Sequence, residues 1–197
     1  MPRNGSAALF LVLSLAPPAP AGEALPQPDA RPPAIVGLAV ERSDGQYVAS
    51  FRLESAFDAE TLGKIDSGLE VVLDYRIEVV RRRRFWMDDR TVQRRVLAST
   101  RYDSLSRQYN LLLSVDAQVE RSSTTDKPAE MRRWMTEIHG IVLGPVSGFT
   151  PPGEFAVRVK SDFPPRFVLF FIPWDRDTPW ARVPLAPAAP DVHDAGR

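Results

Sequence analysis

The chain has no cysteine and only two histidines in its 197 residues. Without cysteine there are no disulfide bonds, so the packing of apolar side chains must supply the stability. His139 and His193 are far apart in the sequence and have no cysteine beside them, which argues against a zinc or copper centre. We therefore expect neither a metal nor any other cofactor.

The chain also has no excess of either charge and none of the common catalytic motifs. It has 25 basic and 25 acidic residues, a balance that argues against a nucleic-acid partner. There is no Gly-x-Ser-x-Gly elbow, no glycine-rich phosphate loop and no Gly-x-Gly-x-x-Gly turn. We identify no catalytic residue and expect a protein that is not an enzyme.

No hydrophobic run is long enough to cross a bilayer, which takes roughly twenty residues. The longest apolar stretch near the start, residues 7–16, follows Arg3 and precedes Ala19-Pro20-Ala21. This order of a basic start, a short apolar run and small residues is typical of a cleaved signal peptide. We predict a signal peptide over residues 1–21 and export to the periplasm.

Proline is abundant, with 19 residues, and it concentrates towards the two ends of the chain. Such segments join helices and central strands poorly. We therefore expect a proline-rich linker over residues 22–33 and a single domain over residues 34–185. Residues 186–197 are expected to form a disordered tail.

Within the domain, apolar and polar residues alternate with period two, as in half-buried strands. Residues 47–53 and 71–79 show this most clearly, and Asp44-Gly45 is a hairpin signal before the first of them. The continuous apolar run 167–172 predicts a buried final strand. Further segments of strand character are residues 35–40, 92–102, 109–115 and 155–160. The pattern predicts a mainly β protein, an antiparallel β-sandwich of about seven strands with two short helical inserts.

The two longest predicted strands, residues 71–79 and 92–102, can be aligned by matching their apolar faces. Placing Tyr75 opposite Thr100 puts Ile77 against Ala98 and Val79 against Val96 on the inner face. The same register pairs Asp74 with Arg101 on the outer face and leaves Glu78 in solvent. Cross-strand pairs of this kind stabilise a sheet, so we take this register as the expectation.

Two segments are predicted as helices. Residues 58–67 begin with Asp58 as a cap and end before Gly68. Residues 128–139 end before Gly140. Their apolar stripe consists of Met131, Trp134, Met135 and Ile138.

The middle of the chain resembles the domain-of-unknown-function family 4390, a group of exported bacterial proteins. The resemblance rests on residues 81–89, where a basic strand end leads into an aromatic and acidic turn, and on residues 101–109. The second segment contains the pattern Tyr102, Leu105, Arg107 and Tyr109. The resemblance implies a location in the cell envelope, and it supplies no functional residue.

Nine arginines lie between Arg81 and Arg107, against three aspartates. We interpret them, with the aromatic tip of the hairpin, as a candidate contact surface for an envelope protein or an anionic envelope component. The alternative is a solvated strand face, with the aromatic tip capping the end of the sandwich. The candidate partner-binding residues are Arg76, Arg82, Arg84, Phe85, Trp86, Arg95, Arg101 and Arg107.

The sequence leaves three functions open. The leading hypothesis is an exported, periplasmic, non-enzymatic binding or structural protein of the bacterial cell envelope. A second is a peripheral protein that binds anionic lipid through Phe85 and Trp86 or through residues 167–174. A third is a hydrolase using the carboxylates of Asp88, Asp89, Asp175 and Asp177, which requires these groups to meet in one cleft.

Overall fold

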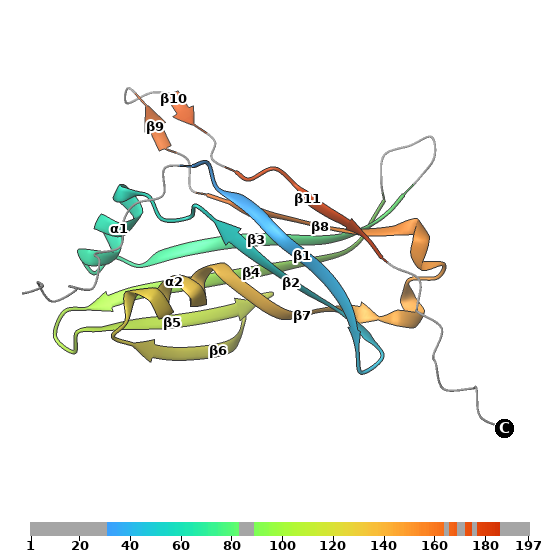
Figure 1. The fold of residues 1–197 in the computed structure, drawn as a ribbon, viewed down its shortest axis with the longest axis horizontal. Helices are drawn as coiled ribbons and strands as arrows, with labels where there is room; N and C mark the ends of the chain where they lie inside the picture. Colours follow the sequence, from blue (N-terminus) through green and yellow to red (C-terminus); the bar gives the residue numbers. More distant parts are fainter. Residues whose placement is uncertain (1–30, 83–88, 164–165, 169–171, 175–176, 186–197) are drawn as a thin grey trace, which may run out of the picture.

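The computed structural model describes residues 31–82, 89–163, 166–168, 172–174 and 177–185. Its largest element is a six-stranded antiparallel sheet (Figure 1). In spatial order the strands are β11 (Ala181–Pro184), β8 (Phe155–Asp162), β3 (Val71–Arg81), β4 (Asp89–Asp103), β5 (Gln108–Val115) and β6 (Gln118–Thr125).

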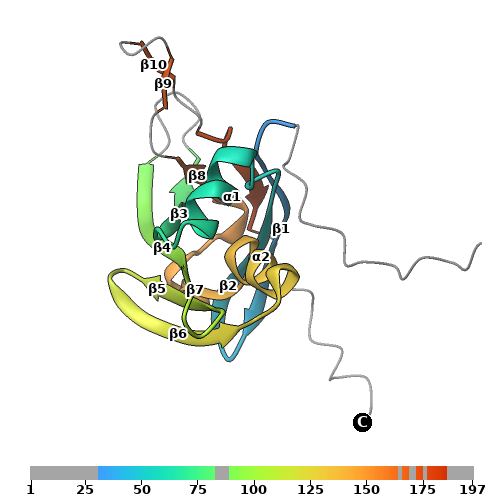
Figure 2. The ribbon, with the colours of Figure 1, turned by 90° about the vertical axis from the view of Figure 1, so that its left-hand side faces the viewer.

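A second sheet of three strands packs on the inner face of the first (Figures 1 and 2). It contains β1 (Ala34–Ser43), β2 (Gln46–Glu54) and β7 (Glu137–Pro145), in that order. Two short strands, β9 (Arg166–Val168) and β10 (Ile172–Trp174), form a separate antiparallel pair. The prediction of a mainly β, sandwich-like fold with two helices is confirmed.

The apolar faces of the two sheets meet in one core. Phe51 of β2 packs edge-on against Tyr75 of β3, with ring centroids 5.3 Å apart. Tyr47 contacts Phe149 in the same way, and Phe149 contacts Phe155. Offset and edge-on aromatic pairs of this kind stabilise a core beyond the area that they bury.

The described residues form eleven strands, more than the seven or so that the sequence predicts. One reason is that β6 has a single apolar residue, Val119, and is exposed along nearly all of its length, so no alternation marks it. Another lies in the predicted final strand over residues 167–172. Its described ends belong to β9 and β10, two strands that pair with each other, and the last strand among the described residues is β11.

The first helix, α1 (Ala59–Asp66), has the boundaries that its sequence indicates. The Asp58 carboxylate accepts a hydrogen bond from the backbone N–H of Thr61 at 2.8 Å. Gly68 follows with a φ of +76°, in the left-handed region that glycine adopts at low cost. Leu62 and Ile65 bury the inner side of the helix in the core.

The second helix, α2 (Pro128–Thr136), is shorter than predicted because the chain continues directly into β7. Ile138 pairs with Phe51 of β2, and His139 follows it in the strand. Pairing with β2 therefore places Ile138 in a strand, although its spacing in the sequence fits the apolar stripe of the helix. The Tyr75 hydroxyl donates a hydrogen bond to the Met135 carbonyl at 2.7 Å, which ties α2 to the six-stranded sheet.

The predicted register of β3 and β4 is wrong by four residues. Tyr75 lies opposite Val96, and Val71 lies opposite Thr100. An even shift leaves every side chain on its predicted face, so the alternation pattern fits both registers equally well. The pairing of Asp74 with Arg101 is also wrong, because Asp74 binds Arg95 instead.

Candidate functional site

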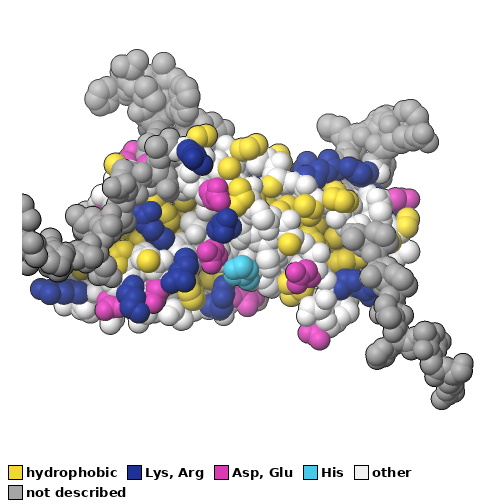
Figure 3. Space-filling model, in the orientation of Figure 1, with side chains coloured by type: hydrophobic (Ala, Val, Ile, Leu, Met, Phe, Trp, Pro, Cys, Tyr) yellow, Lys and Arg dark blue, Asp and Glu magenta, His cyan; other side chains and the backbone are white. Residues whose placement is uncertain are grey.

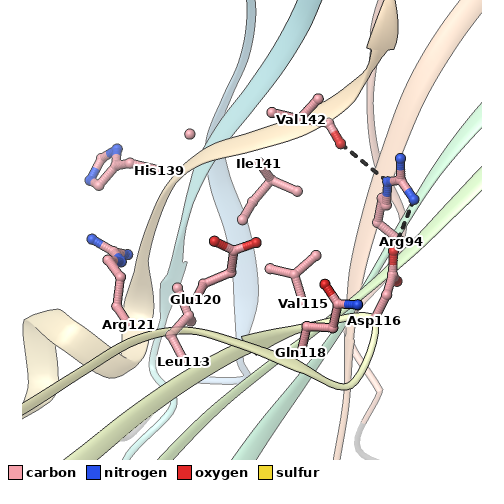
Figure 4. A pocket seen from close by; sticks show the side chains of 11 residues that line it. Arg94, Leu113, Val115, Asp116, Gln118, Glu120, Arg121, His139, Ile141 and Val142 are labelled. Carbon is pink, nitrogen blue, oxygen red and sulfur yellow. Dashed lines mark hydrogen bonds and ion pairs between the residues drawn. The ribbon is translucent and has the colours of Figure 1, made fainter.

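A groove of about 560 Å³ lies between β6 and β7 (Figure 4). Each of these strands is the last strand of its own sheet, and within the described residues neither pairs with a strand on the groove side. An edge strand presents a row of backbone N–H and C=O groups that no neighbouring strand uses. The groove is therefore bounded by two free sheet edges.

The floor of the groove is apolar. Leu113 and Ile141 are buried there, and Val115 is half-buried beside them. Leu113 and Val115 come from β5, whereas Ile141 comes from β7, so both sheets contribute to the floor. Figure 4 shows Val115 and Ile141 directed into the space between the two strands.

Charged side chains line the rim. Glu120 and Arg121 come from β6, and His139 comes from β7 across the groove (Figure 4). The Arg121 guanidinium lies 5.1 Å from the centre of the Trp134 ring, a cation–π contact with α2. Around α2 and β6, basic and acidic side chains are interspersed on the face that Figure 3 shows.

Arg94 of β4 closes the end of the groove away from α2. Its Nη1 donates to the Asp116 carboxylate at 2.9 Å, and its Nε donates to the Val142 carbonyl of β7 at 3.2 Å. Asp116 is itself held in the β5–β6 turn, because it also accepts from the backbone N–H of Arg95 at 2.9 Å. One groove-facing carbonyl of β7 thus already binds a donor from another strand.

The chemistry of the lining suits binding. Its side chains offer apolar surface, hydrogen-bond donors and acceptors, and it includes no hydroxyl or thiol group that could act as a nucleophile. Within the described part of the chain, no cluster of three or more histidine or carboxylate side chains is arranged to hold a metal ion.

Two of the predicted contact arginines, Arg76 and Arg95, form ion pairs within the protein. Arg76 binds Asp162 of β8 at 2.7 Å. Arg95 forms a bidentate ion pair with Asp74 of β3 through Nε and Nη2, and Nη2 lies 2.6 Å from Asp74 Oδ2. The hydrogen bonds that Arg95 donates to Asp74, together with the negative charge of that carboxylate, raise the pKa of Arg95. These charges are partly neutralised before any partner arrives.

The other predicted contact residues do not form one surface. Arg82 is exposed beside the tip of the β3–β4 hairpin, whereas Arg101 and Arg107 are exposed towards the far end of β4. From Asp89 to Arg101, β4 rises roughly 40 Å at about 3.3 Å per residue. Arg84, Phe85 and Trp86 lie outside the described residues.

Glu78, predicted to face solvent, is buried, with 2% of its surface exposed. It accepts a hydrogen bond from Arg158 Nε of β8 at 2.8 Å and lies 3.5 Å from Arg90 Nε of β4. The Arg158 guanidinium is covered in turn by Trp180, whose ring centre is 4.5 Å away. Long side chains from β4 and β8, the strands on both sides, therefore cover the outward face of β3 at Glu78.

The acidic residues considered for hydrolysis do not meet where they are described. Asp89 lies opposite Arg81 at one end of β3. Asp177 binds Lys160, which lies opposite Arg76, roughly 16 Å further along the strand at about 3.3 Å per residue. Asp88 and Asp175 lie outside the described residues.

Asp177 has a structural role. It accepts from Lys160 Nζ at 2.8 Å and from the backbone N–H of Phe163 at 3.2 Å. Partial burial disfavours its charge, but the hydrogen bonds with Lys160, Asp162 and the Phe163 N–H prevail and hold its pKa below the ordinary value.

Sequence reasoning missed the groove. None of the predicted contact residues that the structure describes lines it, and neither of its walls was predicted as a strand. The sequence carries little signal for it, because Asp116-Ala117 forms the turn between β5 and β6 with two positive φ angles, a conformation that is uncommon for alanine. Neither the hairpin partner of β5 nor the edge of β7 across the groove therefore follows from the sequence.

Comparison with known proteins gives one match. The family model described as Domain of unknown function (DUF4390) matches residues 30–183. The comparisons with curated proteins and with solved structures give no match. Among the described residues, neither helix is long and apolar enough to span a membrane.

Proposed function

The chain belongs to the DUF4390 family, and on that premise we propose that it is an exported, non-enzymatic binding protein of the bacterial cell envelope. Its binding site in this proposal is the groove between β6 and β7, and its ligand is a partner protein. The observation that carries the proposal is the pair of free strand edges on either side of an apolar floor. Strand edges that lie open beside an apolar surface are sites where a second chain associates.

The proposed export rests on the first residues of the chain. The apolar stretch 7–16 and Ala19-Pro20-Ala21 have the order of a signal peptide and its cleavage site. A periplasmic location would place the groove among the proteins of the envelope.

Site-specific crosslinking tests the groove as the contact surface. A photoreactive amino acid replaces Gln118, which lines the groove, or Ser122, which lies four residues along β6 and lines the opposite face of the sheet. In cells, we expect a protein adduct from position 118 and none from position 122. Equal adducts from both positions, or none from position 118, would overturn the proposal.

A second candidate function is attachment to an anionic membrane surface at the tip of the β3–β4 hairpin. Arg82 favours it, because its side chain is exposed and, unlike that of Arg81, has no ion-pair partner among the described residues. If the protein attaches to an anionic membrane surface, the mature protein should sediment with vesicles rich in anionic lipid and not with zwitterionic vesicles.

The matched variants for the membrane test are Arg82→Gln with Arg84→Gln, and Arg101→Gln with Arg107→Gln towards the other end of β4. Each pair removes two positive charges, and we expect the first pair to lose sedimentation at low salt and the second to keep it. Failure of the wild-type protein to sediment with anionic vesicles would exclude this function.

A further inference from the structure

We propose that the groove binds a short, extended peptide segment of the partner as an added β-strand between β6 and β7. This inference rests on the proposed function and specifies its mode of binding. Strand addition derives affinity from backbone hydrogen bonds and specificity from alternate side chains, and the groove offers both.

The backbone of β7 is already oriented for an added strand. The Val142 carbonyl points away from β2 and accepts a hydrogen bond from Arg94 Nε at 3.2 Å. In a β-strand the N–H and C=O groups of alternate residues point to the same side. Further along, the register with β2 shifts and the Gly140 N–H donates to Ser50 Oγ at 3.4 Å, so this orientation holds for the stretch of β7 around Val142.

The two walls, β6 and β7, run antiparallel to each other but do not pair. The chain leaves along β6, turns through α2 and returns along β7, so Gln118 lies across from Val142 and Arg121 from His139 (Figure 4). Antiparallel neighbours in a sheet bond directly at about 4.8 Å, but β6 and β7 belong to separate sheets. A strand inserted between them would run parallel to one wall and antiparallel to the other.

The floor selects the side chains of the peptide. Leu113, Val115 and Ile141 form an apolar surface beneath the inserted segment, and alternate residues of a strand point to the same side. The segment should therefore carry apolar residues at alternating positions. Since Gln118, Glu120 and Arg121 of β6 line the groove, the stretch in direct contact spans about four residues.

The end of the groove beside α2 favours a negative charge on the peptide. Arg121 and Arg133 line this end with His139. The acidic groups there are Glu137 and Glu130, of which Glu130 is occupied by Lys127 Nζ at 3.0 Å and by the Thr125 hydroxyl at 2.7 Å. Glu120 in the middle of the groove disfavours a second acidic residue at that position. An acidic residue at one end of an apolar, extended segment is the best match.

The test uses a defined peptide with the sequence Val-Thr-Val-Thr-Val-Asp and capped ends. We expect the mature protein to bind it and to gain amide hydrogen-exchange protection on β6 and β7 around the groove, measured by NMR. A control peptide with the same side chains and N-methyl groups on alternate amides should bind at least about tenfold more weakly, because it cannot complete the ladder. Equal binding of the two peptides would overturn the inference.

A protein variant tests the charged end. Arg121→Gln should weaken binding of the peptide ending in aspartate and leave a peptide ending in asparagine unaffected, whereas Ser122→Gln should change neither. If both peptides respond equally to Arg121→Gln, the charge selection is wrong.

The outcomes separate this inference from the proposed function. An adduct at position 118 in cells without amide protection by any extended peptide would mean that the partner occupies the groove in another way. That result would support the proposed function and contradict strand addition. Peptide protection without an adduct would overturn the proposed function in the cell while the groove's capacity for an added strand stands.

Discussion

Glu78 illustrates how a residue can contradict its own sequence pattern. It occupies a polar position of an alternating strand, yet it is buried and shared by arginines from β4 and β8. The guanidinium groups replace the water that the carboxylate loses on burial. Removal of the Glu78 carboxylate leaves the Arg90 and Arg158 guanidinium groups without this hydrogen-bond acceptor.

We predict that Glu78→Ala lowers the free energy of unfolding by about 1–3 kcal/mol. Glu70→Ala is the matched control, because Glu70 is exposed just before the same strand and its loss should change stability by less than about 0.5 kcal/mol. Urea denaturation of the two variants and the wild type measures both values. Equal effects would mean that the Arg158 and Arg90 contacts contribute nothing.

Asp177 predicts a pH dependence of stability. Its pKa in the folded protein lies below its ordinary value of 3.8, so the folded state favours the carboxylate more than the unfolded state does. The stabilisation is complete above that ordinary value and is lost as the pH falls through it towards the folded pKa. Between wild type and Asp177→Asn, the difference in unfolding free energy should be constant at about pH 5–8 and shrink below about pH 4. Denaturation at a series of pH values checks this, and a difference that grows towards acid would contradict it.

At the scale of elements, boundaries are reliable where a local side chain sets them. Asp58 begins α1 through its own hydrogen bond to Thr61, and Gly68 ends it through its own conformation. The end of α2 has no such local determinant. It is set by β2, far away in the sequence, whose edge recruits residue 137 and those after it.

We predict that Asp58→Ala destabilises the protein by about 0.5–2 kcal/mol, because it removes the cap of α1. Asp66→Ala, in the last turn of the same helix, should change stability by less than about 0.5 kcal/mol. Thermal or urea denaturation followed by circular dichroism measures the difference. A loss for Asp66→Ala as large as that for Asp58→Ala would contradict the role of the cap.

At the scale of the whole molecule, the two sheets share one core and leave a gap between the edges of β6 and β7. The core explains why the chain needs no disulfide bond, since aromatic and aliphatic side chains from both sheets interlock. The gap is where we place the function.

The exported form of the molecule is predicted to begin at or close to Gly22. Mass spectrometry of protein recovered from the periplasm should show that the residues up to Ala21 have been removed. An intact N-terminus in the membrane fraction would contradict the signal-peptide interpretation.

The sequence by itself determined the features that depend on neighbours along the chain. These are the alternating strands such as Val71–Arg81, the Asp44-Gly45 hairpin and the capped helix α1. The middle of the chain was also enough to identify the family. Each of these signals is contained in a few consecutive residues, so no tertiary contact is needed to produce it.

Only the tertiary structure decided the features that depend on which strands become neighbours. Period-two alternation cannot distinguish registers that differ by an even number of residues, so the β3–β4 pairing came from the fold. The burial of Glu78 required β8 beside β3, and the groove required β6 and β7 to end their sheets facing each other. These contacts join residues far apart in the chain, and local patterns carry no information about them.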